Sequence, residues 1–225
     1  MIRLAKGQEP NILVRRGGVW TAEYLRRLDG GGVRRDLPAR YRHPEVKAAL
    51  RVESQDKCIY CETRISHAQY GDIDHYVPVS ARPELVVSWS NLGFTCERCN
   101  NNKGDYWDER FPLINPYTED PSRFLMFAGP IAVQRPGNMR GKLTIERIGL
   151  NRDELIAQRK ERLERVLPFM DEVALMPPGM ARSVLLDILT KEMGPAVEYS
   201  ATIAAHLAPF IRSSAASAPR GQDRR

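Results

Sequence analysis

The feature that most constrains this chain is a set of four cysteines arranged as two Cys-x-x-Cys pairs. They are Cys58 with Cys61 and Cys96 with Cys99, and the sequence contains no other cysteine. Two such pairs that converge on one ion form a tetrahedral Zn²⁺ site, whose binding free energy contributes to folding. Because metal-type spacing with no spare cysteine fits a reducing compartment, we predict a structural zinc site in a cytoplasmic protein. The alternative is two disulfides in a secreted domain.

The 34 residues between the two pairs exceed the usual zinc-ribbon interval of roughly 15–20, so they must hold further structure. They include Asp74-His75 and Asn91, and Asn100 follows the second pair directly. Phosphodiester hydrolysis needs a base that deprotonates water and a cation against the developing charge. A histidine suits the first task, and carboxylate and amide oxygens are the ligands that Mg²⁺ prefers. The segment therefore separates thiolates for zinc from oxygens for a catalytic ion.

These motifs resemble the zinc-binding branch of the HNH (ββα-metal) endonucleases, over residues 58–103. The resemblance implies an α+β fold whose core is a zinc-stapled ββα-metal unit: two strands and a helix hold one Mg²⁺ or Mn²⁺ ion. By motif position it implies that His75 is the general base, that Asp74 and Asn100 are metal ligands, and that Asn91 orients the loop carrying the histidine.

Three points stay open at this stage. Asn101 and Asn102 are alternatives to Asn100 as the ligand. Asn91 precedes Leu-Gly and is equally typical of a residue that caps a turn. Lys103 resembles the family's helix lysine and would contact phosphate, whereas the alternative is an exposed helical lysine.

A wider likeness over residues 1–165 includes the opening I-R-L-A-K-G-Q-E-P and the downstream P-L-I-N-P. It resembles the HNH component of Septu-type and retron-associated anti-phage defence systems. That resemblance implies a bacterial nuclease that cuts double-stranded DNA and works with an SMC- or ABC-like ATPase subunit.

The positive charge of the chain is concentrated at one end. Residues 1–57 hold 13 Lys and Arg against 7 Asp and Glu, a net of +6, which equals the net charge of the whole chain. The pairs Arg15-Arg16 and Arg34-Arg35 contribute to it. A basic segment beside a nuclease motif predicts contact with the DNA backbone. The alternatives are a solvated basic surface and a docking face for an acidic partner.

Gly and Pro residues, which interrupt helices and strands, together with the apolar patterns divide the chain into four segments. We expect a basic, loop-rich arm with one short helix from Trp20 to Leu28. A nuclease domain follows, with a helix starting at Pro44, a strand near Asp74 and a late hairpin made of the runs 124–133 and 143–150. We then expect a helical region and a disordered tail, and no apolar run is long enough for a membrane segment. The segments are residues 1–43, 44–150, 151–212 and 213–225.

The sequence thus predicts an enzyme, a metal-dependent DNA endonuclease. The alternative from another class is a non-catalytic zinc-binding module that recognises nucleic acid or protein. A second alternative is an enzyme that cleaves RNA.

Overall fold

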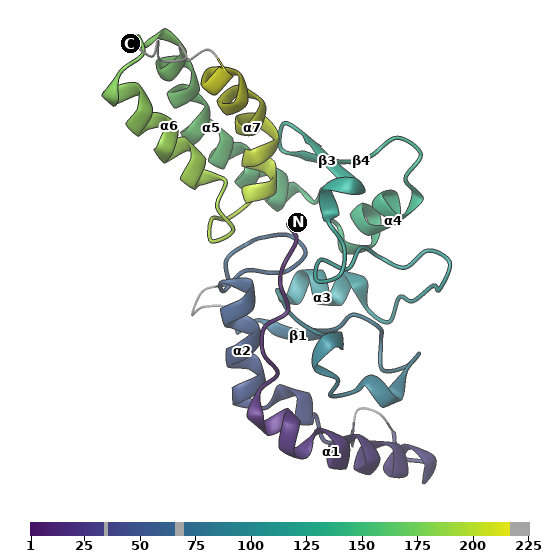
Figure 1. Cartoon of the computed structure of the whole chain (residues 1–225). Coiled ribbons are helices and arrows are strands. Elements are labelled where there is room, and N and C mark those ends of the chain that lie inside the picture. Colours follow the sequence, from purple (N-terminus) through teal and green to yellow (C-terminus); the bar gives the residue numbers. More distant parts are fainter. Residues whose placement is uncertain (34–35, 66–69, 217–225) are drawn as a thin grey trace, which may run out of the picture. The chain divides into compact units, whose positions relative to one another are not determined.

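In the computed structural model, which describes residues 1–33, 36–65 and 70–216, the chain divides into two units (Figure 1). The first unit comprises Met1–Leu125 and Gln134–Leu150, and the second comprises Met126–Val133 and Asn151–Arg225. The basic N-terminal residues therefore belong to the same unit as the cysteines. Residues 126–133, which the sequence placed with the nuclease domain, group instead with the C-terminal helices.

The centre of the first unit is a pair of short strands followed by a short helix. Strand β1 (Asp72–His75) pairs antiparallel with β2 (Leu92–Thr95), with Asp74 opposite Gly93 and His75 opposite Leu92. Helix α3 (Glu97–Lys103) follows β2 and packs on β1, which completes the ββα arrangement within an α+β fold. Helix α2 (Pro44–Ser54) packs on β2, and its start at Pro44 confirms the sequence prediction.

The prediction of a loop-rich arm with a helix that begins at Trp20 was wrong for residues 11–19, which are also helical. Helix α1 (Asn11–Asp29) runs straight through Gly17-Gly18, where the sequence indicated a break. Its buried residues Leu13, Trp20 and Tyr24 lie on one face. Each glycine costs a helix about 1 kcal/mol relative to alanine, and the burial of two aromatic side chains offsets that cost.

The ten residues before α1 run beside α2 in an extended conformation (Figure 1). Lys6 Nζ donates to Glu53 Oε1 of α2 at 2.8 Å and to the carbonyl of Leu92 at 2.6 Å. The same ammonium lies 3.8 Å from the ring centroid of Trp89 and 4.3 Å from that of Tyr117. This lysine therefore attaches the N-terminal segment to the start of β2.

The predicted late hairpin was wrong in its second half. Strands β3 (Leu125–Ala128) and β4 (Ile131–Gln134) pair with each other within the first apolar run. The second run lies in helix α4 (Met139–Ile148), which Asn138 caps by accepting from the Gly141 N–H at 2.8 Å. The buried residues of α4 are spaced i, i+3, i+4 and i+7, which is a helical period, whereas the run L-T-I-E at residues 143–146 alternates apolar with polar residues as a strand does. The buried residues are Gly141, Thr144, Ile145 and Ile148.

Three helices make up most of the second unit: α5 (Asp153–Leu175), α6 (Met180–Glu192) and α7 (Ser200–Ala216). Helix α5 continues past Pro168, although a proline usually ends a helix. A proline inside a helix costs about 3 kcal/mol, and burial of Val166 and Val173 on either side of it compensates. The three helices lie side by side (Figure 1) and share one apolar core. Its buried members are Leu163, Val166, Val173, Leu189, Ile203 and Leu207.

The predicted tail begins too early, because α7 extends through Ala216, and residues 217–225 lie outside the described part of the chain. Within the described residues no helix is long and apolar enough to cross a membrane. Short 3-10 turns connect the remaining segments. They are η2 (Arg40–Arg42), η3 (Pro83–Leu85), η4 (Trp89–Asn91) and η5 (Pro121–Arg123).

Candidate active site

The four cysteines form one cluster with the dimensions of a zinc site. All four are buried, and their sulfur atoms lie within 4.8 Å of one another. Four sulfurs each about 2.3 Å from one zinc ion would lie about 3.8 Å apart, and the Sγ atoms of Cys61 and Cys96 are 3.8 Å apart. Burial raises the pKa of the Cys58 thiol, whereas hydrogen bonds from the neighbouring thiols lower the pKa of Cys61. The donor set therefore fits Zn²⁺ as the sequence predicts.

The cysteines join the segment before β1 to the start of α3. Cys58 and Cys61 lie in a tight turn, where the Glu62 N–H donates to the Cys58 carbonyl at 3.0 Å. Cys96 is the residue before α3 and Cys99 lies in its first turn. A metal bound by all four thus fixes α3 relative to the strands, and with it every polar residue that α3 carries.

Asp74, His75 and Asn100 line a single cavity of about 340 Å³. Asp74 and His75 would point to opposite faces of a regular strand, but His75 is the last residue of β1, and the backbone bends immediately after it. Both side chains therefore reach the same cavity, opposite Asn100 on α3. The structure brings together the three residues on which the predicted chemistry depends.

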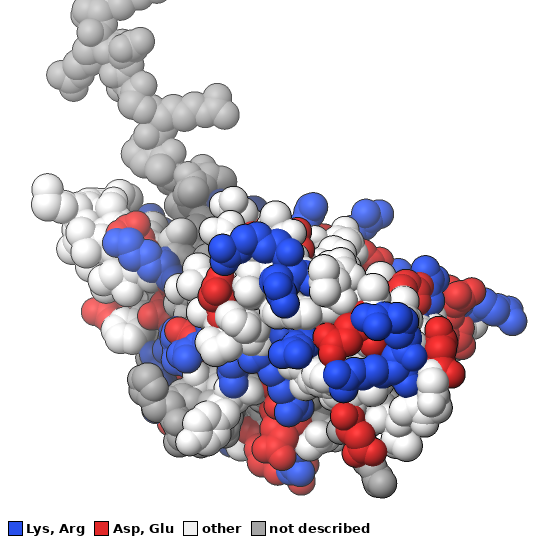
Figure 2. Space-filling model, turned by 90° about the horizontal axis from the view of Figure 1, so that it is seen from below, with Lys and Arg blue, Asp and Glu red and all other residues white. Residues whose placement is uncertain are grey.

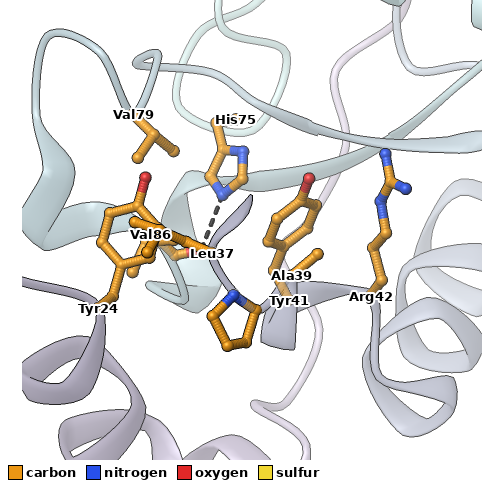
Figure 3. A pocket seen from close by; sticks show the side chains of 9 residues that line it. Tyr24, Leu37, Ala39, Tyr41, Arg42, His75, Val79 and Val86 are labelled. Carbon is orange, nitrogen blue, oxygen red and sulfur yellow. Dashed lines mark hydrogen bonds between the residues drawn. The ribbon is translucent and has the colours of Figure 1, made fainter. Parts of the chain in front are cut away.

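One ring nitrogen of His75 is bonded to the backbone. Nε2 lies 2.7 Å from the Val86 carbonyl oxygen (Figure 3), and the ring meets the Tyr41 ring edge-on at a centroid distance of 4.5 Å. Because a carbonyl only accepts hydrogen bonds, the neutral imidazole carries its proton on Nε2 and its lone pair on Nδ1. Nδ1 is thus the atom of this histidine with basic character.

Asn91 holds the segment that follows His75. Its Oδ1 accepts from the Val77 N–H at 2.8 Å, its Nδ2 donates to the Val77 carbonyl at 3.0 Å, and its own carbonyl accepts from the Tyr76 N–H at 2.9 Å. The side chain therefore bridges two segments and caps no turn of its own. These contacts are what a residue that orients the histidine loop requires.

Asp74 is buried and bonded at both carboxylate oxygens. Lys103 Nζ donates to Oδ1 at 2.9 Å, and the hydroxyl of Tyr60 donates to Oδ2 at 2.8 Å. Burial raises the pKa of Asp74, and the ammonium of Lys103 opposes that rise. Each oxygen keeps a further lone pair, so the carboxylate can still accept a cation from the cavity side.

Asn100 is oriented by Asp72, which lies on β1 two residues before Asp74. Its Nδ2 donates to Asp72 Oδ2 at 3.2 Å. Because a carboxylate accepts only, this bond assigns the amide nitrogen to Asp72 and leaves Oδ1 as the amide's metal-ligand atom. Asn102 instead donates to the Ile148 carbonyl at 3.0 Å, while Asn101 lines the cavity beside Asn100. The geometry favours Asn100 over Asn102 as the ligand.

The residues predicted to bind nucleic acid differ in placement. Arg15 and Arg16 are exposed on α1, and Arg34 and Arg35 lie outside the described residues. Lys103 is only 3% exposed and also donates to the His75 carbonyl at 2.7 Å, so the alternative of an exposed helical lysine was wrong. On the face seen in Figure 2, basic side chains are intermixed with acidic ones.

Sequence reasoning missed two kinds of contact at this site. Tyr60 lies between Cys58 and Cys61, and its hydroxyl donates to Asp74. Tyr41 and Arg42 line the cavity from η2, about 30 residues before the motif. No local pattern marks them, because only the packing of η2 on the strand end brings them there.

Comparison with known proteins agrees with this geometry. Residues 58–106 match the family model of the HNH endonucleases. The Septu protein PtuB of Bacillus thuringiensis is 30% identical over 221 residues, which covers 92% of this chain and 82% of that protein. The Septu protein PtuB of Bacillus mycoides (strain KBAB4) is 29% identical over 150 residues, which covers 53% of this chain and 51% of that protein.

Proposed function

Since this chain belongs to the family of the Septu protein PtuB and contains an HNH endonuclease domain, we propose that it is a metal-dependent endonuclease that hydrolyses double-stranded DNA. The observation that carries the proposal is the shared cavity of Asp74, His75 and Asn100 on a four-cysteine scaffold. A zinc-binding module that only bound its target would not require a histidine base and two oxygen ligands in one cavity.

In this mechanism His75 is the general base. The Val86 carbonyl holds the proton on Nε2, so Nδ1 takes the proton from the attacking water. The resulting imidazolium keeps its bond to the carbonyl, which stabilises the added charge. Asn91 holds the backbone at Val77, two residues after His75, so that the imidazole keeps its orientation during proton transfer.

Asp74 and Asn100 would hold one Mg²⁺ or Mn²⁺ ion, which when bound supplies positive charge to the phosphate and to the leaving oxygen. Tyr60 and Lys103 restrict the carboxylate of Asp74, and Asp72 restricts the amide of Asn100. The two ligand oxygens are thus oriented before any ion or substrate enters.

The family relationship supports a role in anti-phage defence, in the cytoplasm and together with an ATPase subunit. Exposed arginines on α1 supply a surface for phosphate backbone contacts that do not depend on sequence. An ATPase partner would then regulate the nuclease activity.

The test compares wild type with His75→Ala on duplex DNA, single-stranded DNA and structured RNA, each with Mg²⁺ and with Mn²⁺. We expect wild type to nick duplex DNA, and the variant to lose about 10²–10⁴-fold in rate with unchanged zinc content and DNA affinity. His206→Ala on α7 is the matched control and should cut normally. Preferred cleavage of RNA would change the substrate. No cleavage by wild type under any metal, with the ATPase partner present, would favour the non-catalytic module.

A further inference from the structure

A cationic side chain on the non-bridging oxygens of a scissile phosphate would add to the charge stabilisation that a metal supplies. The motif lysine does not supply it, because Lys103 Nζ is buried between Asp74 and the His75 carbonyl. We propose that Arg42 binds the scissile phosphate and is a further catalytic residue of this enzyme. This inference rests on the proposed nuclease function.

Arg42 lies at the right place along the strand. It is the last residue of η2 and lines the cavity shared by Asp74, His75 and Asn100. A second cavity, of about 220 Å³, lies on the Val86 side of His75, and a third, of about 240 Å³, contains Asp72. Arg42 lines all three, so it lies beside β1 over its whole length. A nucleic acid strand laid along β1 would pass this guanidinium.

The charges in the catalytic cavity point to the same residue. Among the described residues that line it, Arg42 is the one Lys or Arg, and the carboxylates of Asp74 and Asp105 line the same cavity. In the described part of the chain, the contact recorded for its guanidinium is with the ring of Tyr41. An arginine that lines this cavity can bind a substrate phosphate there.

Packing fixes where this charge lies. The guanidinium carbon is 5.7 Å from the ring centroid of Tyr41, and the same ring meets the His75 imidazole edge-on. Figure 3 shows Tyr41 between His75 and Arg42. One tyrosine thus sets the spacing between the base and the cation, on a short 3-10 turn that leads directly into α2.

The chemistry of arginine suits this position. Its planar fork can donate two parallel N–H bonds to two phosphate oxygens. Negative charge on those oxygens increases as the attacking water adds, so the bonds strengthen in the transition state and accelerate the reaction. An effect on the rate, more than on affinity, is therefore the signature of this role.

The test uses the full-length protein with Arg42→Gln, Arg42→Lys and the control Arg40→Gln. Arg40 is on the same turn and is exposed like Arg42, but it lies near Glu23, at 4.0 Å, and over Trp20. Single-turnover cleavage is measured at saturating duplex DNA, and affinity is measured separately without added Mg²⁺. Zinc content and thermal unfolding confirm that the variants fold.

We expect Arg42→Gln to slow cleavage about 100-fold with a small change in affinity, Arg42→Lys to be intermediate, and Arg40→Gln to cut like wild type. Wild-type rates for Arg42→Gln, or equal losses for Arg42→Gln and Arg40→Gln, would overturn the inference. So would a loss confined to affinity. The wild-type protein is the control for the proposed function: if it cleaves DNA, the nuclease function holds, and the results for the variants then test the role of Arg42 alone.

Discussion

At the scale of single residues, each proposed catalytic group has one atom fixed by a neighbour. The Val86 carbonyl fixes Nε2 of His75, Asp72 fixes Nδ2 of Asn100, and Tyr60 with Lys103 fixes the carboxylate of Asp74. Orientation of this kind reduces the reorganisation that substrate binding would otherwise require. Substitution of the supporting residues should therefore change the reaction without removing a reacting group.

Asn91→Ala tests the support of the histidine loop. Because it removes both side-chain bonds to Val77, we expect the single-turnover cleavage rate to fall about 100-fold while zinc content is unchanged. Ser90→Ala, at the neighbouring exposed position, is the control. A wild-type rate for Asn91→Ala would assign the asparagine to folding alone.

Lys103→Met tests the buried ion pair. The substitution leaves the carboxylate of Asp74 buried without its cation, so we expect the free energy of unfolding to fall by about 3 kcal/mol, as measured by urea denaturation. Lys160→Met removes a lysine whose ion pair with Glu164 is exposed and should change stability by less than about 1 kcal/mol. Equal effects would contradict a stabilising role for the buried pair.

At the scale of elements, Lys6 attaches the N-terminal segment to the pair of strands β1 and β2. Its contacts join α2, η4 and the first residue of β2, directly after Asn91. Burial lowers the pKa of Lys6, whereas the carboxylate of Glu53 raises it, and burial dominates. The unfolded chain therefore binds this proton more tightly than the folded chain does, and stability attributable to Lys6 rises with pH below 10.5.

Lys6→Met removes both the hydrogen bonds and the titrating group. We expect a loss of about 1–2 kcal/mol at pH 7, because the Leu92 carbonyl and Glu53 lose a donor. The advantage of wild type over the variant should grow as the pH rises toward 10.5, measured by urea unfolding. Arg3→Met, at an exposed position of the same segment, should show neither effect. An advantage that shrinks with pH would reverse the assigned direction of the pKa shift.

At the scale of the whole molecule, both units bury apolar side chains, and the first has the cysteine cluster in addition. The first unit contains the cysteine cluster, and the second has an apolar core of its own between α5, α6 and α7. Trp20, Trp89 and Trp107 all belong to the first unit. Tryptophan fluorescence therefore reports on the zinc-dependent unit alone, while helical circular dichroism reports on both.

Removal of zinc by a chelator should unfold the first unit and spare the second. We expect the tryptophan emission to shift to the red while much of the helical signal persists, since structural zinc contributes about 10–16 kcal/mol to small zinc-binding domains. Added Zn²⁺ should restore the emission. A simultaneous loss of both signals would show that the units unfold together.

The sequence by itself determined the zinc site and the set of motif residues, because ligand spacing and residue chemistry are local properties. It also indicated the C-terminal helices, whose apolar periodicity is strong. It failed at α1 and α4, where burial of Trp20, Tyr24 and Ile145 outweighed the local signals of Gly-Gly and of alternation.

Only the tertiary structure decided what surrounds the motif. It buried Lys103 against Asp74 and brought Tyr41 and Arg42 from η2 to the end of β1. Such contacts join residues about 30 positions apart, and their energies come from desolvation and packing, which no short stretch of sequence encodes. The candidate reacting groups are therefore readable from the chain, whereas their partners are a property of the fold.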